Sequence, residues 1–511
     1  MTCWSMDLHH HSIPMRLTPR TVFLPLELED HPLDEGRRLR VVVVGAGISG
    51  ITSAVFLPAK VPNIDLTIYE RNSDVVSVRC DVPAHAYQAT FEPSTTWSTA
   101  YASGAEIKAY WKGIVEKHEL GKYIRLHSKV TKAEWSEEKG KWLIAVETED
   151  GNHVDEADFL ITGIGHFSDP RLPSYPGMDD NGASGLPILP PLQKAAARID
   201  HYARNKTWVA AAIGGEHLEQ FTITKLMSTR LGDRVDLLNE IIPDFAPNCR
   251  RLTPGPGYLE ALAANNVNYV TNRIERFTRT GIQTKDGTHR EVDAIICATG
   301  HDINFSTAFP IVAKGINLQE AWRPGGSPGF PDSYLSIAAP DFPNFLILLG
   351  PNATGPAGTL CHSVENQVTY CARVLRKAST QGIRSMAPTA AATRDFRAYC
   401  ESFFLRTVMS EYCSSWHNGG IKGGRIHGIW PGSAAHVNAV RREPRWEDWE
   451  YTYLNRQGNR FAWLGNGWTM KDVAASDPAE AANVDLTPWL RAEALGGNVD
   501  LRDYHEQWYA S

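Results

Sequence analysis

A strand, a glycine-rich turn and a helix near the N-terminus constrain the fold of this chain more than any other segment. Leu39–Val44 is a short, continuous apolar run, which is typical of a parallel strand that is buried on both faces. The sequence Gly-Ala-Gly-Ile-Ser-Gly follows at 45–50, residues 51–58 continue as a helix of small and apolar residues, and Ile64–Tyr69 predicts a second strand. These segments form a complete βαβ unit, the opening of a doubly wound α/β fold.

Each glycine of this turn has its own physical role in binding a dinucleotide. Gly45 permits the tight turn, Gly47 lets the backbone approach a pyrophosphate, and Gly50 allows close packing of the helix on the strand. The helix N-terminus supplies N–H groups and a positive dipole to the phosphates. Glu70 comes 20 positions after Gly50, where the fingerprint has an acidic residue that accepts hydrogen bonds from ribose hydroxyls. A glycine turn without a nucleotide is the alternative, and these residues alone do not decide between FAD and NAD. The predicted contacts with the cofactor are Gly45, Gly47, Ile48, Ser49, Gly50 and Glu70.

Composition and charge argue against several classes of protein. The 511 residues are enough for two or three domains, and the formal net charge of -7 argues against a general nucleic-acid binder. No apolar run reaches the roughly 20 residues that span a bilayer, and we expect no secretory signal in residues 1–20. The eight cysteines include no CxxC pair, so we expect reduced thiols in a cytoplasmic protein. The histidines at 9–11 are not expected to bind a metal.

The rest of the chain alternates between helical and strand patterns. Tyr101–Glu119 is amphipathic and predicts a helix, whereas Trp142–Glu147 alternates like an antiparallel strand. Phe159–Ile164 predicts another buried strand, and the Pro, Gly and Asp residues of 166–190 predict a linker between domains. Further short strands are predicted at Ile199–Tyr202, Val235–Leu238, Val267–Val270, Ala294–Ala298 and Phe345–Leu349.

Several segments resemble one family in their sequence and in their order along the chain. They are Gly45–Gly50, Cys80–Tyr87 (CDVPAHAY), Trp97–Glu106 (WSTAYASGAE), Cys249–Gly255 (CRRLTPG), Asp293–His301 (DAIICATGH) and Trp430–Ser433 (WPGS). Together they are similar to the class B flavoprotein monooxygenases, in particular to the Baeyer–Villiger monooxygenases of fungal secondary metabolism. The resemblance covers most of residues 39–470.

This resemblance implies an α/β fold with two nucleotide-binding parts. We expect an irregular leader at 1–37 and the first part of a doubly wound, Rossmann-type FAD-binding domain at 38–170. A truncated NADPH-binding domain of Rossmann type is expected as an insertion at 171–300. Residues 301–511 are expected to return to the FAD domain and to form a helical, Trp-rich region on the substrate side. The implied cofactors are FAD and NADPH.

The chemistry of this family requires a permanent positive charge in the site. Its members reduce FAD with NADPH and insert an oxygen atom from O2 beside a ketone carbonyl, through an anionic oxygen group in a water-poor site. Arginine suits this better than lysine, because it is always protonated and donates in a fork. By the resemblance this arginine is Arg251, with Arg250 as the adjacent alternative, and Asp81 pairs with it and orients it. Taken singly, the two arginines also fit a solvated basic pair, and Asp81 fits a turn residue before Pro83.

The resemblance implies further contacts with the cofactors and the substrate. Tyr87 is expected to line the isoalloxazine pocket, and Gly350–Asn352 to bring the chain back against the flavin. Trp416 lies where the family has a mobile loop over nicotinamide and substrate, although a core tryptophan fits as well. Arg204 and Lys206 are candidates for the 2′-phosphate of NADPH, or form a surface basic pair. The remaining implied cofactor contacts are Val130, Gly182, Ser184, Gly185, Thr299 and Gly300.

Three segments that the family contains are absent from this sequence. Residues 75–78 stand where the family has a Gly-Gly-Thr-Trp stretch and a Tyr-Pro-Gly turn. The F-x-G-x-x-x-H-x-x-x-W fingerprint is missing, and the second glycine-rich turn begins at Asn181 with Asp180 in place of its first glycine and no apolar strand before it. A third gap lies between Glu216 and Arg230, where the family has a longer helical insertion. These gaps fit either a natural variant or a gene with exon sequence left out.

The sequence therefore predicts an FAD- and NADPH-dependent monooxygenase that inserts oxygen from O2 into a ketone of polyketide-like type, to give an ester or lactone. A flavoenzyme that oxygenates heteroatoms or performs another oxidation is a second hypothesis. A flavin-binding remnant without turnover is the third, and the gaps favour it. Neither a nucleic-acid partner nor an integral membrane segment is expected, and the oligomeric state is not predicted.

Overall fold

The computed structural model describes residues 28–76, 82–165, 175–176, 188–203, 206–210, 220–250, 252–255, 257–298, 305–355, 360–455, 457 and 459–481. The chain forms two compact units, one of residues 36–458 and one of the terminal segments 1–35 and 459–511, and each is described by itself. No helix in the described part is long and apolar enough to cross a membrane. Among the same residues, no three His, Cys, Asp or Glu side chains are grouped as metal ligands would be.

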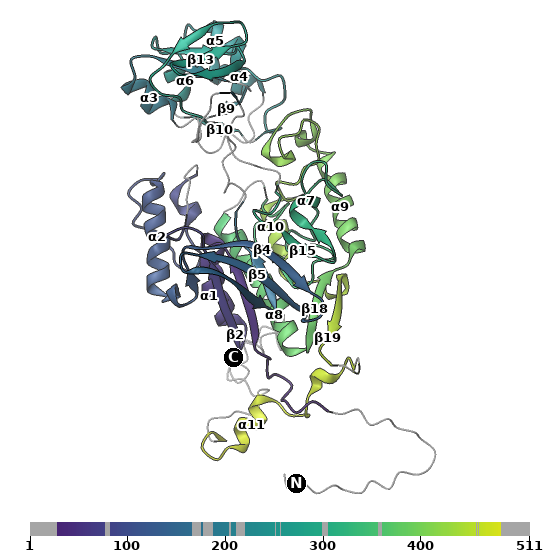
Figure 1. Ribbon diagram of the computed structural model, residues 1–511. Coiled ribbons are helices and arrows are strands. Elements are labelled where there is room, and N and C mark those ends of the chain that lie inside the picture. The colour runs from purple at the N-terminus through teal and green to yellow at the C-terminus, as the bar shows by residue number, and fades with distance from the viewer. Residues whose placement is uncertain are drawn as a thin grey trace, which may run out of the picture. The chain divides into compact units, whose positions relative to one another are not determined.

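A five-stranded parallel sheet forms the core of the larger unit (Figure 1). Its strand order is β17-β7-β1-β2-β3, and every neighbouring pair is parallel. The strands are β1 (Leu39–Val44), β2 (Ile64–Tyr69), β3 (Ile124–Arg125), β7 (Phe159–Thr162) and β17 (Phe345–Ile347). The four strands that the sequence predicts in this sheet are therefore confirmed, and β1 lies at its centre because its apolar residues are buried on both faces.

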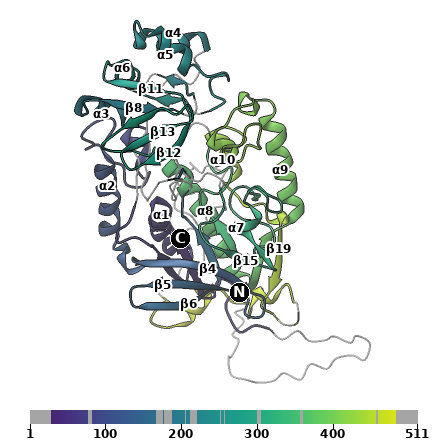
Figure 2. The same cartoon turned by 45° about the horizontal axis from the view of Figure 1, so that its top comes forward.

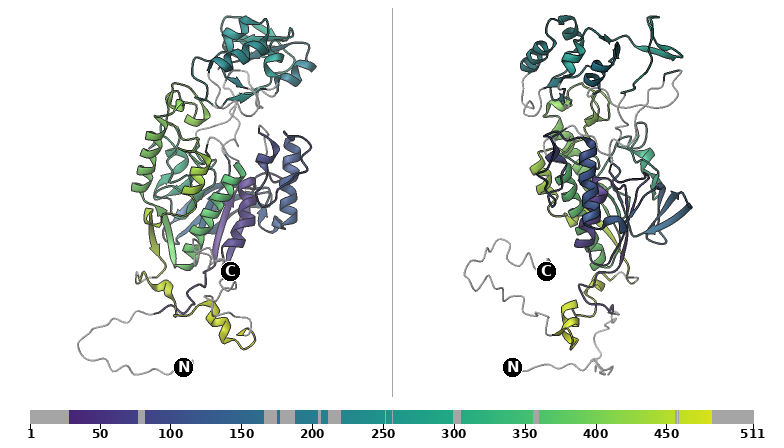
Figure 3. Two further views of the ribbon diagram at one scale, coloured as in Figure 1. Left: turned by 180° about the vertical axis from the view of Figure 1, so that it is seen from behind. Right: turned by 90° about the vertical axis from the view of Figure 1, so that its left-hand side faces the viewer.

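The two faces of β1 pack against different layers, because side chains alternate along a strand. Val41 and Val43 belong to a hydrophobic core that includes α1 (Ile48–Lys60) and α8 (Leu360–Thr380). Figure 3 shows these two helices side by side. Val42, on the opposite face, belongs to a second core beneath another sheet.

That second sheet has the strand order β16-β15-β4-β5-β6 and is antiparallel except for the pair β15 and β4. Figure 2 shows β4, β5 and β6 as one blue layer. Trp142 of β5 is fully buried, and its indole N–H donates to the carbonyl of Pro343 at 2.9 Å. The strands are β4 (Ser128–Ser136), β5 (Lys141–Thr148), β6 (Gly151–Ala157), β15 (Ile311–Ala313) and β16 (Ile316–Asn317).

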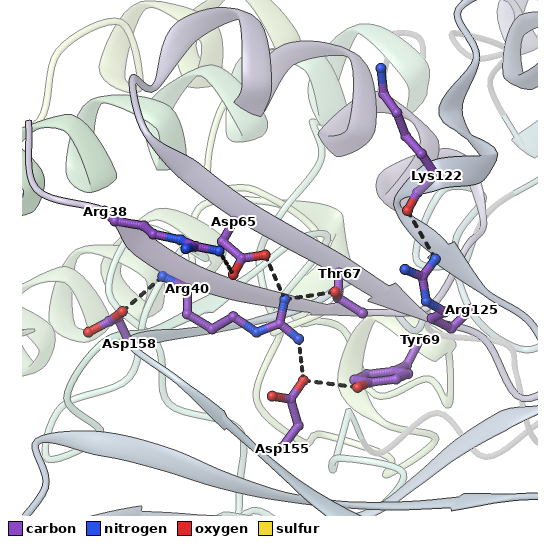
Figure 4. A network of polar contacts seen from close by, with 9 residues as sticks. All are labelled: Arg38, Arg40, Asp65, Thr67, Tyr69, Lys122, Arg125, Asp155 and Asp158. Atoms are coloured by element: carbon purple, nitrogen blue, oxygen red, sulfur yellow. Dashed lines mark hydrogen bonds and ion pairs between the residues drawn. The ribbon is translucent and has the colours of Figure 1, made fainter.

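A polar network joins the parallel sheet to the antiparallel one (Figure 4). The guanidinium of Arg40 on β1 donates to Asp65 and Thr67 of β2 at 3.0 and 2.8 Å. It also donates to Asp155 of β6 at 2.5 Å, and the hydroxyl of Tyr69 donates to the same carboxylate at 2.9 Å. Burial raises the pKa of Tyr69 to about 12, and its hydrogen bond to Asp155 acts in the same direction. The network therefore fixes how the two sheets are positioned against each other.

A third group of elements, from residue 188 to residue 298, has a core of its own. Among the described residues, β8 pairs only with β11 and β9 only with β10, whereas β12, β13 and β14 form an antiparallel sheet. No described strand lies beside β8 where the first strand of a dinucleotide unit would be, which agrees with the truncated domain that the sequence predicts. The elements are α3 (Leu189–Ala195), β8 (Ile199–Tyr202), β9 (Val209–Ala210), α4 (Gln220–Leu231), α5 (Val235–Ile241), β10 (Thr253–Pro254), α6 (Tyr258–Leu262), β11 (Val267–Val270), β12 (Ile274–Thr278), β13 (Gly281–Thr284) and β14 (His289–Glu291).

Two strand predictions in this group are wrong. The segment Val235–Leu238 is part of helix α5, in which Leu237 and Ile241 are buried four residues apart, as a helical face requires. Ala294–Ala298 forms no strand, and its two isoleucines are exposed, so it has no buried face to offer a sheet. Both predictions depended on apolar windows of four or five residues, whose periodicity does not distinguish a strand from other structure.

The expectation of reduced thiols throughout the chain is wrong. Cys249 and Cys413 form a disulfide across a sequence separation of 164 residues. No spacing pattern in the sequence marks these two cysteines as a pair. Burial raises the pKa of three free thiols to about 12, so they are structural rather than reactive; they are Cys361, Cys371 and Cys400.

The remaining elements of the larger unit are mainly helical. They include α2 (Gly104–Lys117), which confirms the helix predicted at Tyr101–Glu119 and begins at the N-cap Ser103. The others are α7 (Leu318–Ala321), α9 (Ala390–Phe404), α10 (Ala434–Val440), the antiparallel pair β18 (Ile383–Pro388) and β19 (Trp449–Tyr453), and the short 3-10 turns η1 (Ala84–Tyr87), η2 (Leu120–Lys122), η4 (Val408–Ser410), η5 (Trp416–Asn418) and η6 (Trp446–Asp448).

The smaller unit contains the turn η7 (Ala462–Leu464) and the helix α11 (Met470–Ser476). Thr469 caps α11. Its hydroxyl accepts from the N–H of Asp472, and the Asp472 carboxylate accepts from the N–H of Thr469.

Candidate functional site

The turn between β1 and α1 lies at the carboxyl edge of the parallel sheet, where such sheets bind ligands. Gly45 has a φ of 104°, which L side chains rarely adopt, and its N–H donates to the carbonyl of Tyr69 at 2.8 Å. A Cβ at Gly45 would lie 2.7 Å from the carbonyl oxygen of Gly163. A Cβ at Gly50 would lie 2.1 Å from the carbonyl oxygen of Gly45. Both positions therefore require glycine for the packing of α1 and β7 around the turn.

Gly47 has different surroundings from the other two glycines. Apart from its two chain neighbours, no described residue would lie within 4 Å of a Cβ at this position, and its φ of -77° and ψ of -163° are open to any residue. Gly47 is also the N-cap of α1, whose first turn has no acidic residue and no side-chain cap. The N–H groups of Ile48, Ser49 and Gly50 belong to the helix start, where no intrahelical acceptor is available. Backbone donors, the positive end of a 13-residue helix and open space together fit a pyrophosphate.

Glu70 follows β2 and is buried beside this turn. Its Oε2 accepts from the N–H of Ala46 at 2.8 Å. Its Oε1 accepts from the N–H and the side-chain amide of Asn72 at 2.9 and 2.6 Å. Because a carboxylate has about four acceptor positions, one remains for a ribose hydroxyl. The sequence predicts the ribose contact, but it does not reveal the bond to Ala46 that connects Glu70 to the phosphate turn.

Two other predicted FAD contacts lie among the described residues. Val130 is buried in β4, two residues after Ser128, whose N–H donates to the carbonyl of Glu70 at 2.8 Å. Val130 is therefore close to the end of the site where Glu70 lies. Tyr87 is buried at the end of η1, and its carbonyl accepts from the indole N–H of Trp111 at 2.9 Å. A contact between Tyr87 and an isoalloxazine ring stays a prediction.

A cavity of about 110 Å³ lies at the ends of β7 and β17, on the same edge of the sheet. The aromatic residues Phe305, Trp322 and Phe345 line it together with polar residues such as Gln319 and Arg323. Gly350 and Pro351, which follow β17, line it as well. Pockets for whole ligands typically measure about 300–1,000 Å³, so this cavity fits one part of a larger ligand. The sequence predicts that Gly350–Asn352 lies against the flavin; Gly350 and Pro351 line this cavity, and their contact with a flavin stays a prediction.

A buried arginine holds the chain beyond this cavity in place. The guanidinium of Arg441 donates to the carbonyl of Leu335 at 3.2 and 3.0 Å and to that of Ala353 at 2.7 Å. It also lies 5.1 Å from the ring centre of Trp430. Burial lowers the pKa of Arg441 to about 9, so the side chain keeps its charge at neutral pH. No sequence pattern marks Arg441, because only the tertiary packing buries it.

The residues predicted to perform the chemistry lie outside the described residues, as do most predicted NADPH contacts. These are Asp81, Gly182, Ser184, Gly185, Arg204, Arg251, Thr299 and Gly300. Arg250, the alternative to Arg251, donates to the carbonyl of Lys206 at 3.2 Å and lies 5.9 Å from the ring centre of Phe245. Burial lowers the pKa of Arg250.

The disulfide connects the segment of the predicted catalytic arginine to the segment of Trp416. Cys249 lies two positions before Arg251, and Cys413 lies three positions before Trp416. A Cβ added to Gly428 would lie 2.9 Å from ring atoms of Trp416, so this tryptophan packs directly on the backbone of the 426–430 segment.

Comparisons with known proteins agree with the geometry of the turn. Residues 39–322 match the family described as pyridine nucleotide-disulphide oxidoreductases. The FAD-binding monooxygenase tazF of Aspergillus terreus is 31% identical over 523 aligned positions, which cover 84% of this chain and 92% of the relative. The chain belongs to the FAD-binding monooxygenases of the Baeyer–Villiger type.

Other members of this monooxygenase family are also similar to this chain over most of its length. The FAD-binding monooxygenase moxY of Dothistroma septosporum is 28% identical and covers 92% of this chain. That alignment extends over 559 positions, more than the 511 residues of the chain, so the relative has segments that this chain lacks. A Baeyer–Villiger monooxygenase of Pseudomonas aeruginosa is 25% identical and covers 80% of the chain and 90% of its own length.

Solved structures support the monooxygenase fold. A steroid monooxygenase bound to NADP has a TM-score of 0.71 at 20% identity and covers 81% of this chain and 99% of its own. A cyclohexanone monooxygenase from Rhodococcus sp. Phi1 bound to NADP+ has a TM-score of 0.70 at 19% identity, with 82% and 100% covered. The fold is therefore a doubly wound FAD domain with an inserted, truncated NADPH-type domain and a helical C-terminal region.

Proposed function

We propose that this chain is an NADPH-dependent FAD monooxygenase that inserts one oxygen atom from O2 beside the carbonyl of a ketone, giving an ester or a lactone. The observation that carries the proposal is the turn at Gly47, where α1 begins without a side-chain cap and the Glu70 carboxylate accepts from the N–H of Ala46. A FAD-binding monooxygenase that is 31% identical supports the same assignment.

The order of the strands gives FAD a direction across the site. Its pyrophosphate binds at Gly45–Gly50 after β1, and its adenosine ribose binds Glu70 after β2. The flavin half then extends to the other side of β1, over β7 and β17, where the cavity lies. Tyr87 contacts this half, and Val130 contacts the adenine half. Bound FAD, once reduced by NADPH, supplies the electrons that activate O2.

The residues of the chain then position and neutralise the reacting groups. Arg251 places a permanent positive charge beside the developing anionic oxygen, and Asp81 orients the guanidinium. The family resemblance supports both roles. The similarity to FAD-binding monooxygenases of fungi supports a polyketide-like ketone as the substrate.

NADPH binding is assigned to the truncated part, residues 171–300, with the FAD-binding parts at 38–170 and after residue 301. Gly182, Ser184 and Gly185 would contact its pyrophosphate, Arg204 its 2′-phosphate, and Thr299 and Gly300 connect the two nucleotide parts. One observation favours a second candidate, a flavin-binding protein without NADPH-driven turnover. Among the described residues, β8 has only β11 as a partner, so no described strand stands beside β8 to support such a turn.

One experiment separates these functions. The purified protein is examined for flavin absorbance and mixed with NADPH without oxygen, and O2 and a ketone are then added. We expect rapid bleaching of the flavin and a product that is heavier by one oxygen atom. Flavin that binds but does not bleach with NADPH would contradict the monooxygenase, and absence of flavin would contradict both candidates.

A further inference from the structure

A neighbouring side chain occupies part of the Glu70 carboxylate. Asn72 donates to Oε1 of Glu70 twice, from its backbone N–H at 2.9 Å and from its side-chain amide at 2.6 Å. Oε2 of the same carboxylate accepts from the N–H of Ala46 at 2.8 Å. Glu70 is buried and Asn72 is exposed, so a side chain that could extend into water folds back onto a buried carboxylate.

The connection between β3 and β4 holds the backbone of both residues. The N–H of Glu70 donates to the carbonyl of Arg125 at 2.9 Å, and the carbonyl of Glu70 accepts from the N–H of Ser128 at 2.8 Å. Between these two residues, His127 has a φ of 50° and donates its N–H to the carbonyl of Asn72 at 3.1 Å. Because both backbones are anchored to the same connection, the Asn72 amide is fixed relative to the carboxylate that it contacts.

The hydrogen bonds of Glu70 determine which of its oxygens remains open to a ligand. Each carboxylate oxygen has about two acceptor positions. The two donors of Asn72 fill those of Oε1, and the N–H of Ala46 fills one of those on Oε2. The open position is therefore on Oε2, the oxygen that contacts the phosphate turn. Without the Asn72 amide, a second position would open on Oε1.

The same kind of contact occurs outside the turn and provides a comparison. Asn268 of β11 donates its side-chain amide to the Asp200 carboxylate of β8 at 2.9 Å, and this pair joins two adjacent strands. The pair of Asn72 and Glu70 differs because its carboxylate also binds Ala46, which directly precedes Gly47. An oxygen with one open acceptor position at this place is available to the nucleotide.

From this arrangement we infer that Asn72 is a positioning residue, which occupies Oε1 of Glu70 so that Oε2 accepts from one hydroxyl of the adenosine ribose of FAD and not from both. The inference rests on the proposed function, which places this ribose at Glu70. It adds that the chain distinguishes the two ribose hydroxyls, and that Asn72 is responsible for the distinction. Asn72 acts through Glu70 and takes no part in the chemistry of the flavin.

The test is a titration of the deflavinated protein with FAD and with two FAD analogues, whose adenosine ribose lacks either the 2′-hydroxyl or the 3′-hydroxyl. Binding is followed by flavin fluorescence, without NADPH and without a ketone. We expect one analogue to bind roughly 10- to 150-fold more weakly than FAD, because it loses one hydrogen bond to a charged group. The other analogue should bind within about 3-fold of FAD, because its missing hydroxyl makes no bond to Glu70.

Variants of Asn72 separate positioning from a structural role. Asn72→Ala opens Oε1 to the second hydroxyl, so the ratio of the two analogue affinities should fall by about 5-fold or more. Asn72→Asp keeps the size of the side chain but has no side-chain N–H, so the ratio should fall in the same way. A general loss of stability weakens all three flavins alike and leaves the ratio unchanged.

Two further variants serve as controls. Asn268→Ala removes the same amide-to-carboxylate contact outside the turn and should leave all three affinities unchanged. Glu70→Ala removes the acceptor and should bind FAD and both analogues with equal affinity.

The outcomes distinguish this inference from the proposed function. Equal penalties for the two analogues in the parent, or no penalty for either, would overturn the inference even in a protein that oxygenates ketones. A parental affinity ratio in both Asn72→Ala and Asn72→Asp would also overturn it, because Asn72 would then only stabilise the loop. A parent that distinguishes the analogues through Asn72 but is not bleached by NADPH would support the inference and contradict the monooxygenase. A protein that binds no FAD would contradict both.

Discussion

Substituting the glycines of the β1–α1 turn separates a packing role from a binding role. A methyl group at Gly47 has no described residue within 4 Å apart from its chain neighbours, whereas one at Gly50 lies 2.1 Å from the backbone oxygen of Gly45. The two substitutions add the same atoms three residues apart in one helix start. We therefore expect Gly47→Ala to impair FAD binding without unfolding the protein, and Gly50→Ala to destabilise the protein itself.

The magnitudes follow from these contacts. Alanine at Gly47 restricts the unfolded chain, which stabilises by about 0.4–1 kcal/mol, but it is a poorer N-cap, so the net change stays within about 1 kcal/mol. Gly47→Ser adds the same Cβ and a better cap, so the apoprotein should be at least as stable as the parent. Losing one charge-assisted hydrogen bond to the pyrophosphate costs about 1.5–3 kcal/mol, or roughly 10- to 150-fold in FAD affinity. Gly50→Ala forces a backbone contact apart and should cost about 1–3 kcal/mol or more.

The assay is reconstitution of the deflavinated protein. Urea unfolding of the apoproteins gives the stability of each variant, and titration with FAD gives its affinity. Gly47→Ala and Gly47→Ser should unfold like the parent and bind FAD weakly. Parental FAD affinity in both would refute the placement of the pyrophosphate over Gly47. A Gly50→Ala apoprotein as stable as the parent would refute the packing role.

Three further substitutions test a catalytic role, a packing role and a titration. Arg251→Ala should lower product formed per NADPH consumed by about 100-fold or more, with partial recovery in Arg251→Lys, and oxygenation at the parental rate would exclude the role. Asp155→Asn should cost about 1–3 kcal/mol in urea unfolding, because the Arg40 guanidinium loses one of its two charged partners and keeps only Asp65. The exposed Arg38→Ala should change stability by less than about 0.5 kcal/mol, and equal effects would contradict the network. Folding lowers the pKa of His427 from 6.5 to about 4. The neutral ring therefore contributes up to about 3 kcal/mol to the free energy of unfolding above pH 6.5, and this contribution is lost as the pH falls to 4. His427→Phe should therefore lose less stability than the parent over this range, and identical pH profiles would refute the assignment.

The sequence predicts the pyrophosphate end of the site well, because its determinants are local. A buried strand, a residue with positive φ and a helix start follow one another between Leu39 and Gly50, and each is recognisable from a few neighbouring residues. Glu70 is predicted for the same reason, since the spacing fixes it at the end of β2. The bond from Ala46 to Glu70 is not predictable, because it depends on the conformation of the turn.

Short apolar windows and buried polar residues could not be assigned from the sequence. The segment Val235–Leu238 has too few residues to show whether its period is that of a strand or a helix. The helical period becomes visible only when the fold shows that Leu237 and Ile241 are both buried. Arginine and histidine are usually found at protein surfaces, but Arg441 and His427 are buried by segments far away in the chain. The pairing of Cys249 with Cys413 likewise depends on contacts between distant segments.

The two ends of the proposed FAD site differ in the segments that form them: the pyrophosphate end is formed by one local segment, and the flavin end by several distant segments. The groups proposed to hold the pyrophosphate lie within residues 39–70, with Gly163 after β7 packed against Gly45. The wall at the flavin end combines Gly165, Phe305 and Gly350 from three distant segments, with His427 behind it from a fourth. A substitution in any of these segments alters this end without disturbing the glycine turn. In the proposed monooxygenase, changes at the cavity wall around Phe305 would therefore alter substrate specificity, whereas the glycine fingerprint would stay the same.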